Sequence, residues 1–206
     1  MAANRRWWAW GGLLGAAALV AALVTARPFR HTPLPDRWRE ARAGWLYRSA
    51  QIDPGDVEPF LRNQKIDTIL DLSSEEVDPL RDAETAASQK LGIRYYHLPV
   101  EKGTQVDNLA KAVAEIDKAH RRGDRVWLHC AVGYRRSAAA FAIYARMIEK
   151  EPPHIAYGEL TRWAEPDSTW APKMQAWIEK HYDEIEAGVK AELEKPDPPR
   201  PVPAPG

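Results

Sequence analysis

The chain has 206 residues, with 29 basic and 29 acidic side chains and therefore a formal net charge of zero. This balance excludes a protein whose whole surface is built to bind nucleic acid. A single cysteine, Cys130, excludes an intrachain disulfide framework and a cysteine-based structural zinc site. The length suits one compact domain with additional terminal segments.

The N-terminal segment 1–27 is predicted to attach the protein to a membrane. Nineteen residues from Trp7 to Thr25 carry no charge. A helix of that length spans roughly 28 Å, close to the ~30 Å hydrocarbon core of a bilayer. Tryptophans at its start and arginines on both sides suit a single transmembrane helix. A cleaved secretory signal ending near Ala26 is the alternative, and a buried core helix is disfavoured because nothing marks a polar face.

The charges around the apolar run give opposite indications of the side of the membrane on which the domain lies. Residues 1–46 hold seven arginines and two acidic residues, a net of +5, and the rest of the chain carries −5. The five arginines after the apolar run favour a cytoplasmic domain, whereas the Arg5–Arg6 pair before it favours export. Segment 28–43 is predicted to be a juxtamembrane linker. Segment 195–206 is predicted to be a disordered tail, because six of its twelve residues are proline.

Residues 44–194 are predicted to form one α/β domain. Short apolar runs with β-branched or aromatic residues predict three strands, at 66–72, 92–99 and 125–130. Helical composition or periodicity predicts helices at 78–91, 106–119, 137–150, 155–163 and 172–190. This alternation indicates a mostly parallel central sheet flanked by helices on both faces.

The loop after the third predicted strand carries the candidate chemistry. Five residues, Gly133 among them, separate Cys130 from Arg136 and Ser137. If a helix begins near Arg136, the backbone N–H groups of residues 131–136 gather at its N-terminus and bind an anion. Arg136 offers a planar fork to two phosphoryl oxygens, and the positive surroundings lower the pKa of the Cys130 thiol. The predicted site is a phosphate-binding loop with a reactive thiolate.

This stretch resembles the HC-x5-R-[ST] signature of the cysteine-based protein tyrosine phosphatases. Segments 47–51, 68–72 and 93–99 are similar to the small dual-specificity branch, so the resemblance covers about residues 44–150. It implies the dual-specificity phosphatase fold and two-step phosphoryl transfer through a cysteinyl-phosphate, without a metal or another cofactor. It also implies site residues: the nucleophile Cys130, the orienting His129, Ser137 as a donor to the sulfur, and the substrate-binding loop Ala131, Val132, Gly133, Tyr134, Arg135 and Arg136.

The general acid is the part of the predicted site for which the sequence offers several candidates. The resemblance implies an aspartate roughly 30 residues before the cysteine, but no aspartate stands at that distance. Glu101, 29 residues before Cys130, is the preferred acid, because a glutamate can do the same work at a suitable pKa. Asp107 is the alternative, although it also suits the first turn of the next helix. Asp71, or no acid at all, completes the set.

The predicted function is hydrolysis of phosphomonoesters, with a phosphoprotein preferred over an inositol lipid because only Arg135 adds charge within the loop. Two alternatives stay open. One is a membrane-anchored phosphate-binding protein without turnover. The other is a rhodanese-like sulfurtransferase, which the loop length and the Arg136–Ser137 pair disfavour. The expected partners are a phosphorylated protein or small phosphomonoester and, through the N-terminal helix, a membrane, with no nucleic acid.

Overall fold

The structure, a computed structural model, describes residues 33–74, 79–101, 104–162 and 169–203. The predicted anchor within residues 1–27 lies outside the described residues. Among the helices that are described, none is both long and apolar enough to cross a membrane.

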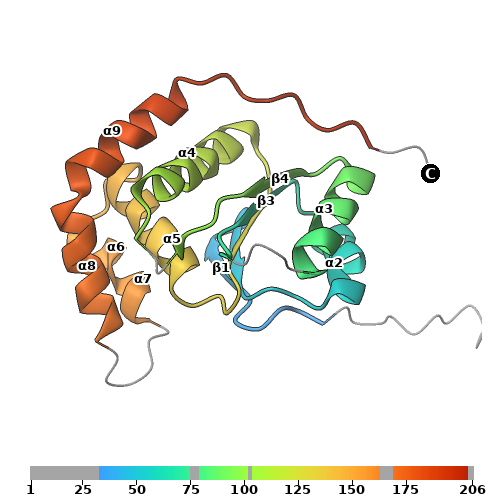
Figure 1. Ribbon diagram of the computed structural model, residues 1–206, viewed down its shortest axis with the longest axis horizontal. Helices are drawn as coiled ribbons and strands as arrows, with labels where there is room; N and C mark the ends of the chain where they lie inside the picture. Colours follow the sequence, from blue (N-terminus) through green and yellow to red (C-terminus); the bar gives the residue numbers. More distant parts are fainter. Residues whose placement is uncertain (1–32, 75–78, 102–103, 163–168, 204–206) are drawn as a thin grey trace, which may run out of the picture. The chain divides into compact units, whose positions relative to one another are not determined.

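Five strands form one sheet in the order β1-β2-β5-β3-β4 (Figure 1). They are β1 (Arg39–Arg42), β2 (Leu46–Ser49), β3 (Thr68–Asp71), β4 (Arg94–His97) and β5 (Val126–His129). Only β1 is antiparallel to its neighbour, which confirms the mostly parallel sheet. Ser49 and Asp71 are both in register with His129, so the carboxyl ends of three strands meet at one edge. In open parallel sheets, that edge is where ligands bind.

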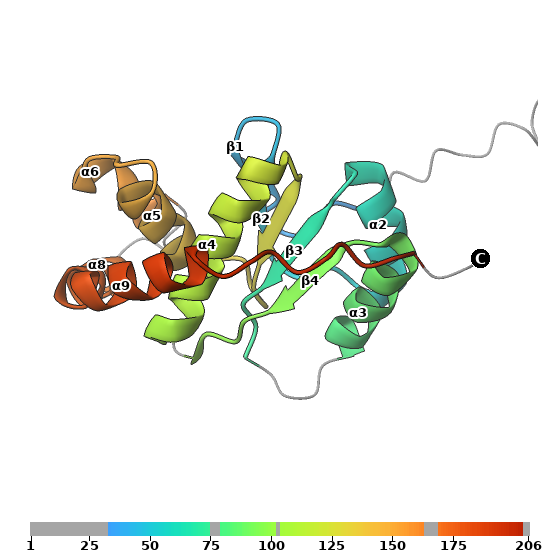
Figure 2. The same ribbon diagram turned by 90° about the horizontal axis from the view of Figure 1, so that it is seen from above.

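Helices cover both faces of this sheet, as predicted. Figure 2 shows α2 and α3 on one side, α4 and α5 on the other, and α8 and α9 in an outer layer beyond them. The helices are α2 (Val57–Gln64), α3 (Pro79–Leu91), α4 (Val106–Arg122), α5 (Arg136–Met147), α6 (Pro153–Ala156), α7 (Gly158–Thr161), α8 (Trp170–Lys180) and α9 (Tyr182–Leu193), with a 3-10 turn at Pro54–Asp56. The predicted helices 155–163 and 172–190 are each divided in two, and α2, β1 and β2 were not predicted from periodicity.

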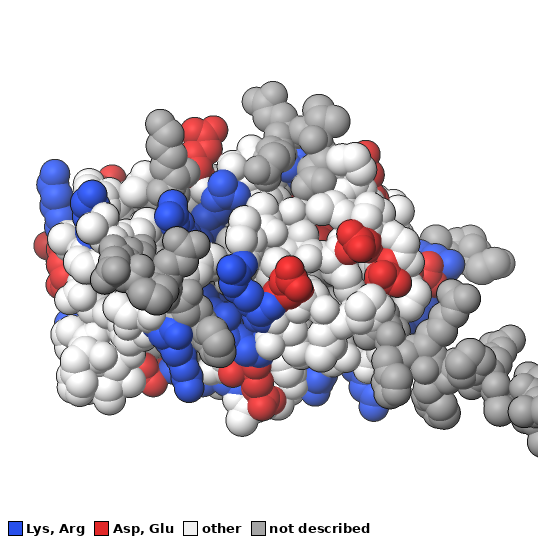
Figure 3. Space-filling view, turned by 90° about the horizontal axis from the view of Figure 1, so that it is seen from below, with Lys and Arg blue, Asp and Glu red and all other residues white. Residues whose placement is uncertain are grey.

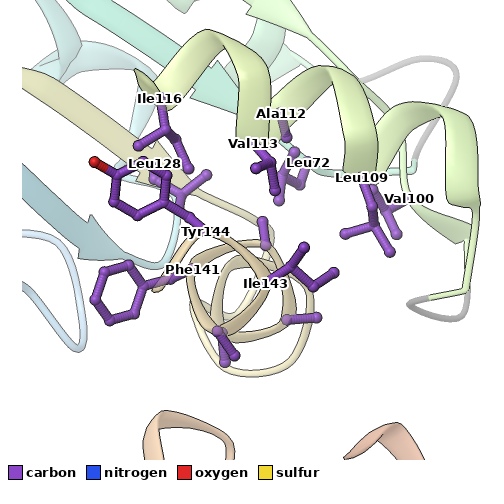
Figure 4. Packing of buried hydrophobic residues seen from close by; sticks show 14 of the residues in the cluster. Leu72, Val100, Leu109, Ala112, Val113, Ile116, Leu128, Phe141, Ile143 and Tyr144 are labelled. Atoms are coloured by element: carbon purple, nitrogen blue, oxygen red, sulfur yellow. The ribbon is translucent and has the colours of Figure 1, made fainter. Parts of the chain in front are cut away.

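The larger core cluster lies between the sheet and helices α4 and α5. Ile116 of α4 lies beside Leu128 of β5 and Tyr144 of α5, and Val113 lies beside Leu72, as Figure 4 shows. Each large apolar side chain buried in this way contributes about 1.5–3 kcal/mol. A smaller cluster around Trp127 fills the space between the sheet and helices α2 and α3. Packing on both faces holds the loop between β5 and α5 in place.

The structured domain begins earlier than predicted. Strand β1 lies within segment 28–43, which was predicted to be a linker, so that prediction is corrected here. Just before β1, Trp38 stacks on Tyr47 with ring centroids 4.8 Å apart. At the end of β1, Arg42 forms ion pairs with Glu149 and Glu151. The strand has no apolar alternation because side-chain ion pairs and a neighbouring strand stabilise it, and neither is visible in the local sequence.

The proline-rich tail also departs from the prediction. Its described residues, 195–203, form no helix or strand, but they lie against the domain (Figure 2). Arg200 pairs with Asp67 at 2.8 Å and donates to the Gly92 carbonyl oxygen, while Asp197 pairs with Arg122 at 2.7 Å. Two charged side chains among the prolines therefore fix a segment that was predicted to be disordered.

Candidate active site

The loop after β5 has the predicted strand–loop–helix form, with α5 beginning at Arg136. Gly133 has a φ of +67°, and its N–H donates to the Cys130 carbonyl oxygen at 3.1 Å. A Cβ at this position would lie 2.2 Å from Ala50 N and 2.3 Å from Ser49 C. Because both contacts are with backbone that cannot move aside, only glycine fits. The loop is thus pressed against the carboxyl end of β2.

A pocket of about 390 Å³ opens on this loop. It is lined by Cys130, Ala131, Val132, Tyr134, Arg135 and Arg136, and also by Arg37. The structure thus brings together the predicted loop residues except Gly133, which lies behind them. Figure 3 shows the molecule from the side of this loop, with basic side chains near the middle of the face. Sequence analysis missed Arg37, because it precedes β1 and stands 95 residues before Val132.

The surroundings of Cys130 favour a thiolate. Its side chain is buried, with Sγ 3.9 Å from Ser137 Oγ. Burial by itself raises the pKa of the thiol. Hydrogen bonds from the backbone N–H groups of Ser137 and Tyr134 and from the Ser137 hydroxyl outweigh this effect and lower the pKa of Cys130 below its ordinary value. Such a thiolate can serve as a nucleophile.

The positive charge of the pocket comes from arginine. Arg136 Nη1 is buried and has no hydrogen-bond partner among the described residues, and Arg136 takes part in none of the ion pairs found there. A guanidinium held without a carboxylate offers its two-pronged donor face to an incoming anion. The described His, Cys, Asp and Glu side chains form no group of three or more that could hold a metal ion.

His129 lies in a buried charge cluster on the α3 side of the sheet. Its ring stacks on Trp127, and its two nitrogens lie 3.4 Å from Glu84 Oε2 and 3.8 Å from Asp71 Oδ1. Burial lowers the pKa of His129, but the two carboxylates outweigh it and raise the pKa to about 9. The ring therefore faces the carboxylates of Glu84 and Asp71, and its orienting role stays a prediction. Nothing in the sequence pointed to Glu84.

The candidate acids are not brought to the pocket in the described part of the chain. Glu101 lies in a turn after β4 and Asp107 in the first turn of α4, both exposed, and neither lines the pocket. Asp71 is fully buried, where its carboxylate accepts hydrogen bonds from Ser73 and Tyr95. Its lone pairs are used within the structure, which argues against Asp71 as the acid. Glu101 stays a prediction.

Comparison with known proteins identifies the fold. No family model matches the chain, and no curated protein sequence does. Among solved structures, TpbA of P. aeruginosa matches with a TM-score of 0.53 at 20% identity, over 71% of this chain and 86% of that one. Tk-PTP matches with a TM-score of 0.53 at 18% identity, over 70% and 92% of the two chains. The PTP-2 phosphatase of Cydia pomonella matches with a TM-score of 0.51 at 17% identity, over 69% and 89%. The chain therefore has the fold of the cysteine-based protein tyrosine phosphatases, as the resemblance implied.

Proposed function

We propose that this protein is a phosphatase that hydrolyses phosphomonoesters, phosphotyrosine in proteins above all, through a cysteinyl-phosphate intermediate. The observation that carries the proposal is the buried Cys130, with a lowered pKa, in a pocket lined by its own loop and three arginines. The structural similarity supports it, since one of the matching TpbA structures is a complex with phosphotyrosine. A thiolate in a cationic pocket suits attack on a phosphate dianion.

The reaction has two steps. In the first, the Cys130 thiolate attacks phosphorus in line, the S–P bond forms, and the P–O bond to the leaving group breaks with proton transfer from an acid. The loop N–H groups and Arg136 bind the three equatorial oxygens, which carry the charge of the transition state. In the second, water attacks phosphorus and releases phosphate, while the sulfur leaves as a thiolate that Ser137 stabilises through its hydroxyl.

Glu101 is the acid that we propose for the first step. A 4-nitrophenolate leaving group needs little protonation, whereas the phenolate of phenyl phosphate needs much. We expect Glu101→Gln to slow the hydrolysis of phenyl phosphate at least tenfold more than the hydrolysis of 4-nitrophenyl phosphate. The matched variant Asp107→Asn should slow both substrates equally. The reverse pattern would assign the acid to Asp107.

A phosphate-binding protein without turnover is the second candidate, and the absence of a carboxylate from the described lining of the pocket favours it. The test is hydrolysis of 4-nitrophenyl phosphate by the full chain, beside its Cys130→Ser variant. Turnover that is lost in the variant supports the phosphatase. Vanadate binding by a folded protein that lacks turnover would instead support the binding protein. Turnover of thiosulfate would point to the sulfurtransferase.

We also propose that segment 1–27 attaches the domain to a membrane, because its uncharged run of nineteen residues is long enough to span one. A topology reporter fused after Gly206 reports the side on which the domain lies. Recovery of the full chain in the aqueous fraction, with its N-terminus intact, would contradict the proposal.

A further inference from the structure

Arg37 is a pocket residue that comes from outside the signature loop. It lines the same pocket as Cys130, and its Nη1 donates to the Val132 carbonyl oxygen at 2.7 Å. A guanidinium has five N–H donors, so this single bond leaves most of them for another acceptor. Arg37 is exposed, which lets a bound molecule reach it.

The chain around Arg37 is fixed on both sides. The backbone carbonyl oxygen of Asp36 accepts a hydrogen bond from Ala50 N at 2.8 Å. The Trp38 ring stacks on Tyr47 and lies edge-on against Phe60. Arg37 itself has a φ of 58°, a conformation that side chains with a Cβ seldom adopt. Such a residue, held by firm neighbours on either side, is a common feature of binding sites.

Arg37 and Arg135 share the rim of the pocket with an aromatic surface. Each guanidinium carbon lies within 6 Å of the Tyr134 ring centroid, at 5.7 and 5.8 Å, and Arg135 also lies 6.0 Å from the Trp170 ring. Among the described residues, neither arginine forms an ion pair with a carboxylate, whereas many other arginines do. The rim thus offers two uncompensated cations beside aromatic rings, Arg135 from the signature loop and Arg37 from the segment before β1.

We propose that Arg37 and Arg135 form a second anion subsite, which selects phosphotyrosyl peptides with an acidic side chain next to the phosphotyrosine. The inference rests on the proposed phosphatase function. The Tyr134 and Trp170 rings and the exposed Val132 favour a peptide over a sugar headgroup, because they offer apolar contact to neighbouring side chains. Arg37, from the segment before β1, thus adds a second positive charge beside that of Arg135 at the rim of the pocket.

The experiment compares two phosphotyrosyl peptides that differ only in Glu or Gln beside the phosphotyrosine. The leaving group is the same in both, so the ratio of their kcat/KM values isolates the effect of the second negative charge. We expect the full chain to prefer the Glu peptide by about fivefold, the upper end of what an exposed charge pair contributes. In Arg37→Gln the ratio should fall toward one, and in Arg37→Lys it should be partly kept. Arg62→Gln, on α2, is the matched control and should keep the full ratio.

Other outcomes separate the two proposals. No hydrolysis of either peptide or of 4-nitrophenyl phosphate would overturn the phosphatase function itself. Hydrolysis with equal rates for the two peptides would overturn the subsite alone. If Arg37→Gln slows both peptides by the same factor, Arg37 only holds the loop through the Val132 carbonyl, and the subsite is refuted. Faster turnover of a doubly phosphorylated inositol lipid in vesicles, with the same dependence on Arg37, would replace the peptide with a lipid headgroup.

Discussion

Gly133→Ala separates a steric requirement of the active-site loop from the general preference of glycine for positive φ. At Gly133 (φ +67°) the new Cβ would lie 2.2–2.5 Å from backbone atoms of Ser49 and Ala50. At Gly44 (φ +80°), in the turn between β1 and β2, a Cβ would have no atom within 4 Å. The left-handed conformation costs a residue with a Cβ about 1 kcal/mol at either position. Only Gly133→Ala adds an overlap that backbone must relieve, at about 1–3 kcal/mol.

We therefore expect Gly133→Ala to lower the free energy of unfolding by about 2 kcal/mol more than Gly44→Ala does. For a domain of this size that difference lowers the Tm by roughly a further 4–8 °C. Urea unfolding measures the free energy of unfolding, and the rate of 4-nitrophenyl phosphate hydrolysis reports whether the loop keeps its active geometry. Gly44→Ala should keep its activity, while Gly133→Ala should lose most of it. Equal destabilisation by the two variants would refute the argument that the loop is pressed against β2.

Three further predictions concern buried or catalytic charges. Glu159→Gln removes the carboxylate that lies 3.0 Å from the fully buried Arg48. We expect the free energy of unfolding in urea to fall by about 3 kcal/mol, because an unpaired buried cation is left behind. A fall below about 1 kcal/mol would mean that water reaches Arg48. Burial lowers the pKa of His129, but the carboxylates of Glu84 and Asp71 outweigh this effect and raise the pKa to about 9. The imidazolium therefore contributes its full stability below pH about 6.5, and this contribution is lost as the pH rises through about 9. The urea midpoint should accordingly fall more between these pH values in the wild type than in His129→Gln, and parallel curves would contradict the cluster. Arg136→Lys should keep the fold by circular dichroism and lose about 10²–10³-fold in kcat, since lysine cannot form the two-pronged contact; near-normal turnover would exclude Arg136 as the phosphate ligand.

The sequence alone was sufficient to predict the strand–loop–helix form of the signature loop. Cys130, Gly133, Arg136 and Ser137 lie within eight residues, and a strand–loop–helix junction needs only local turn and helix signals to be recognised. The periodicity of residues 106–119 likewise located α4, because an amphipathic helix on a sheet requires that spacing. These features depend on contacts between near neighbours in the chain.

Other features were decided only by tertiary structure. Strand β1 is polar and depends on β2 and on the partners of Arg42, far along the chain. Arg37 reaches the pocket because Trp38 is anchored on Tyr47, and the charge of His129 depends on Glu84 from α3. The tail is held by Arg200 at the far edge of the sheet. In each case the energy comes from pairing residues distant in sequence, so local propensity carries no signal of it.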